Sequence, residues 1–242
     1  MSAEILNLSL FPINPDFKIE QIASAGDYIL FKHLNKNLID IDADGRIYGD
    51  LAQSWKIEKD HTSFTFRIKD TAKFSDNSKV TSNDIKSSFD DLVQKKGGIH
   101  FDFSNVKKIN ILSDSEINIE LKQSTPRFLR NLTHPEFGIR KTESIKNSNY
   151  DITSGCYAIL SILKSEIILK KNPLCQDSQN TFKKVSFSFV IPNEQKESAL
   201  NKKKDFYISL MPEKDLKEVI STNNYKTESP HIGFTFWLAT NT

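Results

Sequence analysis

The side chains of this sequence best suited to metal or redox chemistry are five histidines and two cysteines. No two histidines have the i, i+3 or i+4 spacing that places two metal ligands on one face of a helix, and no cysteine cluster lies beside them. The sequence therefore predicts no metal site, and turn or surface positions are expected for His33, His61, His100, His134 and His231.

Motifs for nucleophilic catalysis and phosphate binding are also missing. The 242 residues contain no Gly-x-Ser-x-Gly nucleophile elbow, no P-loop and no Gly-x-Gly-x-x-Gly. Only 8 glycines are available to build phosphate-cradling loops. We therefore expect no catalytic residues, no bound cofactor and no enzymatic activity.

The overall charge pattern narrows the class of partner. Lysine and arginine total 33, aspartate and glutamate total 31, and the two signs are mixed along the chain to give a formal charge of +2. Such a chain has no basic patch for nucleic acid. No run approaches the roughly 20 apolar residues that a membrane helix needs. We expect a globular protein with no nucleic-acid partner and no membrane insertion of this segment.

The most clearly specified stretch runs from residue 41 to residue 92. It opens with a turn at Asp42–Gly45, and residues 62–68 then alternate between apolar and polar, the period of a half-buried strand. A second turn centres on Asn77, a residue type that tolerates the left-handed region. Thr81 or Ser82 then caps a helix that reaches Leu92, with an aspartate in its first turn. The stretch predicts structure and no catalysis.

This stretch also carries a resemblance to a known family. The run DADGRIYGDLAQSWKI, followed by TSFTFRIKDTAKFSDNSKVTSNDIKSSFDDL, resembles the bacterial extracellular solute-binding proteins that serve ABC importers of peptides and nickel. The family pattern is D-x-D-G-x-x-x-x-x-L-A-x-S-W, then K-F-x-D-G-x-x-x-T-A-x-D-V-x-x-S-F. Asn77 replaces the usual glycine, and Ser82-Asn83 replaces Ala-Glu, and both changes keep the local chemistry.

The other predicted elements follow the order of that family. A first strand ends before a Pro-containing turn, and a helix capped by Ser24 extends to Leu38. Glycines 97 and 98 end the helix that begins near residue 81. The remaining predictions are a hairpin over 106–112 and 116–121, a helix over 126–132, a hairpin after Gly155, strands over 185–191, 206–210 and 231–238, and helices over 194–203 and 212–220.

The resemblance implies a mixed α/β fold, specifically the first lobe of a two-lobe periplasmic-binding-protein-like fold. Residues 1–46 and 150–242 are expected to form a discontinuous α/β ligand-binding lobe. Residues 47–149 are expected to form a smaller, β-rich inserted subdomain. Family members continue into a second lobe, which by this resemblance is absent from the chain.

The two cysteines flank a predicted hairpin. If that hairpin turns near Lys164-Ser165, its strands pair so that residue numbers sum to about 329–331, from the antiparallel register. Cys156 and Cys175 would then be close enough for a disulfide, which an exported protein allows. The alternative, two unrelated small residues, stays open at this point.

Candidate ligand-binding residues come from two sources. The resemblance implies that the loop after the first strand faces the ligand cleft, which selects Ile19, Glu20, Gln21 and Ser24. Aromatic side chains that could line a cleft add Phe101 and Tyr157, whereas Trp55 is expected in the scaffold.

The function implied by the resemblance is solute binding, with peptides the expected class, through closure of two lobes over the ligand. A membrane-embedded ABC permease would be the protein partner, and the location would be periplasmic or cell-surface. One alternative is a solute-sensing domain of a cytosolic transcriptional regulator, for which an upstream helix-turn-helix would be evidence. The other is a structural paralogue that no longer binds solutes.

Overall fold

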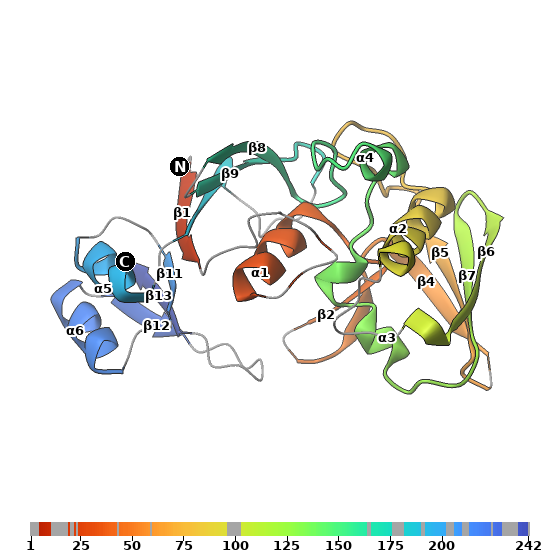
Figure 1. The fold of residues 1–242 in the computed structure, drawn as a ribbon, viewed down its shortest axis with the longest axis horizontal. Helices are drawn as coiled ribbons and strands as arrows, with labels where there is room; N and C mark the ends of the chain where they lie inside the picture. Colours follow the sequence, from red (N-terminus) through yellow and green to blue (C-terminus); the bar gives the residue numbers. More distant parts are fainter. Residues whose placement is uncertain are drawn as a thin grey trace.

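The computed structural model describes residues 5–10, 19, 22, 24–42, 44–58, 60–95, 103–163, 166–175, 182–189, 192–201, 206–209, 213–223, 225–228 and 237–241. Within these residues the strands form three sheets (Figure 1). The elements are β1 (Ile5–Leu10), α1 (Ala25–Leu34), β2 (Ile39–Ile41), β3 (Ile47–Gly49), β4 (Ala52–Ile57), β5 (Ser63–Ile68), α2 (Ser82–Gln94), η2 (Phe103–Asn105), β6 (Val106–Ser113), β7 (Glu116–Leu121), α3 (Phe128–Asn131), η3 (Pro135–Phe137), α4 (Thr142–Lys146), β8 (Tyr157–Leu163), β9 (Glu166–Lys171), β10 (Lys184–Phe189), α5 (Pro192–Leu200), β11 (Phe206–Ser209), α6 (Glu213–Asn223), β12 (Tyr225–Glu228) and β13 (Trp237–Asn241).

The largest sheet has the strand order β12-β13-β11-β1-β10-β9-β8. β1 pairs in parallel with both β10 and β11, and the other pairings are antiparallel. Parallel neighbours need crossover connections, and α5 lies in the chain between β10 and β11. The fold is therefore mixed α/β, as the sequence predicts.

Helix α1 packs its apolar residues against the largest sheet. Phe31 and Leu34 are buried in one cluster with Leu169 of β9 and Phe187 of β10. The helix begins with a capping box between Ser24 and Asp27. It ends at Leu34, four residues before the predicted end, because the Lys36 carbonyl accepts a hydrogen bond from the Ile139 N–H at 2.8 Å instead of continuing the helix.

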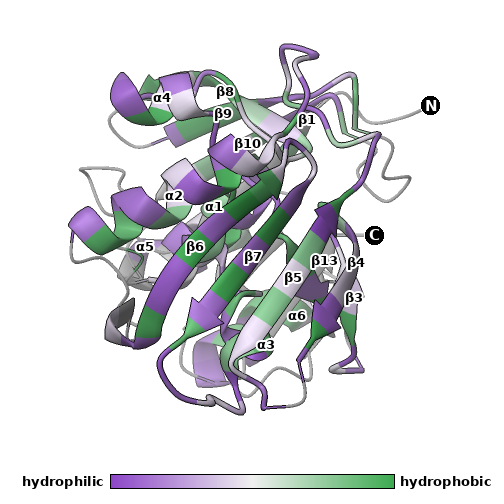
Figure 2. Ribbon diagram, turned by 90° about the vertical axis from the view of Figure 1, so that its right-hand side faces the viewer, coloured by the Kyte–Doolittle hydropathy of each residue, from purple (hydrophilic) through white to green (hydrophobic). Residues whose placement is uncertain are grey.

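The four-stranded sheet, in the order β4-β5-β7-β6, has one apolar and one polar face. Phe64, Phe66 and Ile68 alternate with Thr65 and Arg67 along β5, and the three apolar side chains are buried. Figure 2 shows the same alternation of hydrophobic and hydrophilic residues along β6 and β7. The predicted strand and hairpin are confirmed, although β6 extends one residue further, to Ser113.

Helix α2 covers the apolar face of this sheet with Ile85, Phe89 and Leu92. Its first turn is fixed by Asp84, whose Oδ2 accepts from the Thr81 N–H at 2.9 Å. Thr81 is the cap, as predicted, and the last helical residue is Gln94. The predicted stop at glycines 97 and 98 lies outside the described residues.

The seven-stranded and four-stranded sheets have separate hydrophobic cores. Leu38 and Ile39 belong to the core of the four-stranded sheet, although they precede the predicted boundary at residue 47. The β2–β3 hairpin straddles that boundary. The chain therefore enters the smaller core directly after α1.

Several predicted elements differ in extent from the observed ones. The helix predicted over 126–132 is the single turn α3, and the strand predicted over 231–238 corresponds to β13 from residue 237 onward. Residues 231–236 lie outside the described part. The sequence missed β2, β3, β4, β12 and α4. All of these except β4 have at most five residues, which is too short for a clear periodic pattern.

Candidate functional site

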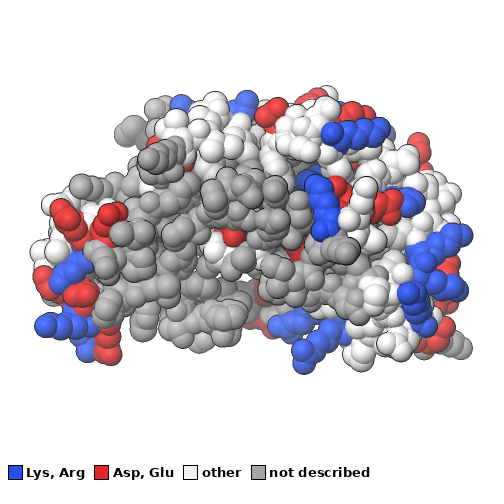
Figure 3. Space-filling model, viewed as in Figure 1, with Lys and Arg blue, Asp and Glu red and all other residues white. Residues whose placement is uncertain are grey.

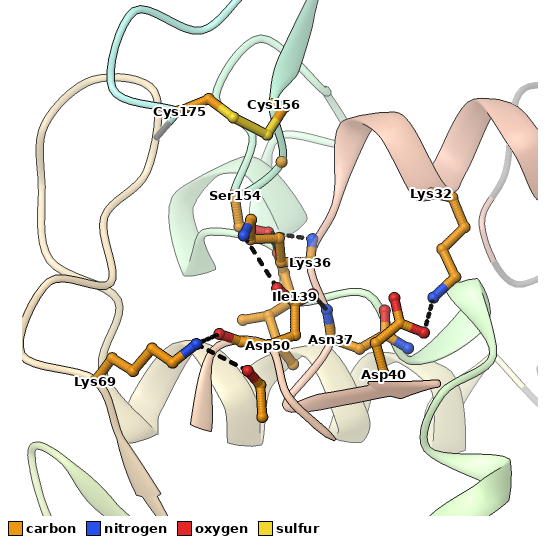
Figure 4. Close-up of polar contacts among 12 residues, drawn as sticks. Lys32, Lys36, Asn37, Asp40, Asp50, Lys69, Ile139, Ser154, Cys156 and Cys175 are labelled. Atoms are coloured by element: carbon orange, nitrogen blue, oxygen red, sulfur yellow. Dashed lines mark hydrogen bonds and ion pairs between the residues drawn. A yellow bond between two sulfur atoms is a disulfide. The ribbon is translucent and has the colours of Figure 1, made fainter. Parts of the chain in front are cut away.

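The connection between the two cores is a polar junction, which we define as residues 34–37 together with Ile139, Ser154 and Gly155 (Figure 4). The Lys36 N–H donates to the Ser154 hydroxyl at 3.0 Å, and that hydroxyl donates to the Ile139 carbonyl at 2.6 Å. The Gly155 N–H donates to the Leu34 carbonyl at 2.9 Å. One short segment is thus held from both sides by residues more than a hundred positions away.

Gly155 is required by this close approach. A Cβ atom at this position would lie 2.6 Å from the carbonyl carbon of Leu34, which is too close for any other residue without a backbone shift. The sequence identifies this glycine only through its family pattern, and the structure supplies the steric reason.

Asp50 gathers the polar groups around the junction. Its two carboxylate oxygens accept from the Asn37 N–H and the Lys36 ammonium, each at 3.0 Å. Lys69 donates to the main-chain carbonyls of Gly49 and Asp50 at 2.8 and 2.6 Å. Burial lowers the pKa of Lys69, against the opposing effect of the Asp50 charge. These charged groups are bound to other groups of the protein. They thereby reinforce the junction that connects the two cores.

A second group of side chains lies along α1. Lys32 pairs with Asp40 at 2.6 Å, and the Tyr28 ring meets the His134 ring edge-on at a centroid distance of 5.4 Å. Burial and the nearby Asp40 charge raise the pKa of Tyr28. Tyr28 keeps 38% of its surface exposed.

The histidines that the structure describes take different roles. His61 lies in a turn, as predicted, with a positive φ of 56°. His33 does not, because its ring packs against Phe187 and Tyr157 and its Nδ1–H donates to the Ile29 carbonyl at 2.7 Å. Burial lowers the pKa of His33, which favours the neutral ring. Among the described residues no group of three histidine, cysteine or acidic side chains could hold a metal ion.

The predicted ligand-binding residues are placed as follows. Ile19 is fully buried and Tyr157 is 1% exposed, and both lie in the core beneath α1. The Tyr157 hydroxyl donates to the Phe182 carbonyl at 3.2 Å. The Ser24 hydroxyl accepts a hydrogen bond from the Asp27 N–H and so caps α1. In these positions all three residues serve packing or capping, while Glu20, Gln21 and Phe101 lie outside the described residues.

Cys156 and Cys175 form a disulfide, with their Cα atoms 5.0 Å apart. The strands between them pair from Tyr157 with Lys171 to Leu163 with Glu166, close to the predicted register. The bridge closes the β8–β9 hairpin at its open end. Cys156 directly follows the junction residue Gly155 in the chain, and Figure 4 shows the bridge close to Ser154.

Comparison with known proteins identifies the family. A model of the bacterial extracellular solute-binding proteins, family 5, matches residues 46–242, which is more than half of the chain. The chain belongs to this family. It is a family of solute-binding proteins and not of enzymes.

Relatives of this family 5 chain are longer than the chain itself. The probable D,D-dipeptide-binding periplasmic protein DdpA of Escherichia coli (strain K12) is 30% identical over 155 residues, covering 60% of the chain and 30% of that protein. Two solved structures share the fold. They are the A. tumefaciens R10 protein AgaA in complex with agropinic acid (TM-score 0.81, 22% identity, 90% of this chain, 46% of that one) and the E. coli murein tripeptide binding protein MppA (TM-score 0.82, 15% identity, 95% and 50%). The chain spans about half the length of these structures.

Two features of this family 5 chain were missed from sequence. The first is the junction at Asn35 to Asn37. The partners of these residues lie near residues 139 and 154, so no local pattern in the sequence indicates the contacts. A pocket of about 430 Å³ is lined by Arg127, Arg130 and Asn131. Its only signal is two arginines three positions apart in the run PRFLRN, without an acidic neighbour.

Proposed function

We propose that this chain is the first lobe of a solute-binding component of an ABC importer and that its solutes are peptides or similarly small polar compounds. The observation that carries the proposal is the extent of the structural match. It covers 90–95% of this chain but only 46–50% of the solved relatives. Together with the family match, this supports a lobe that works with a second one.

The division within the lobe is part of the proposal. Residues 1–46 and 150–242 would supply the ligand-binding α/β lobe, and residues 47–149 the inserted subdomain, with a core that already begins at Leu38. The separate cores and the hydrogen-bonded junction between them support this division. A membrane-embedded permease would take up the solute after lobe closure.

The solute class rests on the relatives. DdpA is named for a D,D-dipeptide and MppA for a murein tripeptide, whereas AgaA is in complex with agropinic acid. The shared feature is a small polar molecule with ionised groups. Such ligands bind where a few fixed polar groups converge, and two lobes provide those groups from opposite sides.

Titration of the chain with a D,D-dipeptide, a murein tripeptide and glucose as control, followed by NMR, tests the proposal. We expect peptide-specific shifts at the edge of one lobe, with a dissociation constant weaker than about 0.1 mM because half of the contacts are missing. No peptide-specific shift at about 10 mM would contradict solute binding. Binding tighter than about 1 µM would contradict the two-lobe mechanism.

A further inference from the structure

Among the described residues, the pocket at α3 is lined by two guanidinium groups and one amide. Arg127 is the residue just before α3, and Arg130 and Asn131 lie three and four positions later, a spacing that brings the three side chains to the same pocket. A guanidinium group offers five N–H donors in a planar fork, and an amide adds two more. All of these groups donate, and the pocket volume of about 430 Å³ admits a small molecule.

Among the described residues no acidic side chain pairs with either arginine, whereas several other cations do have such a partner. Arg140 pairs with Asp91, and Lys141 with Asp76. Even the exposed Arg46 pairs with Asp44 at 3.3 Å. The acidic residue on β2, the strand that contacts α3, is Asp40, and it is held by Lys32 at 2.6 Å. Two like charges one turn apart repel each other, so the turn gains stability when an anion lies between them.

The turn that carries the pocket is firmly anchored. On its inner side Phe128 is 2% exposed and its ring lies 4.6 Å from that of Phe64, centroid to centroid. The Thr133 hydroxyl donates to the Arg130 carbonyl at 2.8 Å, and the Asn37 amide donates to the Leu132 carbonyl at 2.7 Å. The backbone beneath the arginines is therefore preorganised, which reduces the entropy lost when a ligand binds.

We infer that the Arg127–Arg130–Asn131 pocket binds an oxyanion, the carboxylate or phosphate group of a small solute or of a lipid head group. Both groups match the guanidinium fork in a bidentate way. The inference is independent of the proposed function, because the pocket would bind its anion whether or not a second lobe closes over this one.

Two measurements on the 242-residue chain separate the sources of the anion. Calorimetry with inorganic phosphate and with citrate tests free solutes. Sedimentation with phosphatidylglycerol vesicles, against phosphatidylcholine vesicles, tests head groups. The variants are Arg127→Gln, Arg130→Gln and their combination, with Arg67→Gln as a matched control, since Arg67 is also exposed and forms no ion pair in the described part of the chain. Circular dichroism checks that each variant is folded.

We expect binding in at least one measurement, a loss of about tenfold in affinity for each single substitution and little change in Arg67→Gln. Raised salt should weaken binding, because exposed charges are screened. Arg130→Lys, which keeps the charge and loses the fork, should retain an intermediate affinity. Absence of binding in both measurements, or equal losses in Arg67→Gln and the pocket variants, would overturn the inference. If the double variant unfolds, the single variants decide.

Discussion

The four-stranded and seven-stranded sheets are built from different kinds of contact. In the smaller sheet β4–β5 and β6–β7 are hairpins of strands adjacent in the chain. In the larger sheet β1 pairs with β10 and β11, so Leu6 lies opposite Val185. Local pairing closes short loops, whereas the β1 pairings require most of the chain to be ordered first. The smaller unit should therefore form more independently than the larger one.

The two units also differ in the polar groups that they bury. Around α2, Asp84 accepts hydrogen bonds from Thr81 and Thr142, and Asp91 pairs with Arg140 at 2.5 Å. The α1 side of the larger sheet relies on apolar packing, in which Phe187 is fully buried, and on one disulfide. Removing one partner of a buried ionic link leaves the other charge unpaired, whereas truncating a buried apolar side chain leaves a cavity.

The largest predicted effect comes from the apolar cores. Phe66→Ala and Phe187→Ala each remove a fully buried ring, and each should lower the free energy of unfolding by about 3–5 kcal/mol. Hydrogen exchange measured by mass spectrometry should show faster exchange in β4–β7 and α2 for Phe66→Ala, and in β8–β10 for Phe187→Ala. Uniformly faster exchange in both variants would mean that the sheets unfold as one unit.

Asp91→Ala should lower the stability by about 3 kcal/mol, because the Arg140 guanidinium stays buried without its carboxylate. The neighbouring Asp90 is the matched control, since its carboxylate is 55% exposed and pairs with Lys86 on the same helix face. Asp90→Ala should cost less than about 0.5 kcal/mol. Urea denaturation gives both values. Similar losses for the two variants would show that the buried pair stabilises the protein no more than the exposed pair does.

Removing the disulfide should cost about 2–3 kcal/mol, because the bridge limits the freedom of the unfolded chain between Cys156 and Cys175. Urea midpoints of Cys156→Ala/Cys175→Ala, with and without dithiothreitol, measure the loss. The urea midpoint of the double variant should not change when dithiothreitol is added. The midpoint of the parent protein should fall to that of the variant when the disulfide is reduced. Two reactive thiols in the natively purified protein would refute the bridge.

The elements predicted correctly from sequence are those with local signals. The strand around Phe66 shows in its alternation, and Asn77 adopts φ 71° in the predicted turn. The end of α1 could not be predicted in this way. The apolar spacing continues to Leu38, but tertiary hydrogen bonds at Lys36 end the helix earlier.

Side-chain roles at the candidate site were harder to predict. Tyr157 is aromatic and lies two residues after Gly155, but residue type does not reveal that its ring is buried under α1. Asp50 and Lys36 are fourteen positions apart and meet only after β2 and β3 have paired. Such contacts depend on the fold as a whole, so single-sequence patterns carry no information about them.

The smallest predicted effect concerns Asp76, which links the smaller unit to the segment leading back to the larger sheet. Its carboxylate accepts from the Lys141 ammonium at 2.6 Å and from the Ser78 hydroxyl at 2.6 Å. Burial alone would raise the pKa of Asp76, but these hydrogen bonds outweigh it and lower the pKa from 3.8 to about 2. The folded state therefore binds this proton less tightly than the unfolded state does.

The stabilisation from Asp76 is present above pH about 4 and is lost as the pH falls toward 2. Because the side chain is 31% exposed, solvent screening should limit it to about 0.5–1 kcal/mol. Free energies of unfolding between pH 2 and 5 should therefore separate the parent protein from Asp76→Asn at the upper end and converge at the lower end. Lys141→Gln removes the same pair from the other side and should flatten the profile similarly. A parent profile parallel to that of Asp76→Asn would show that this ion pair does not contribute to the stability of the folded state.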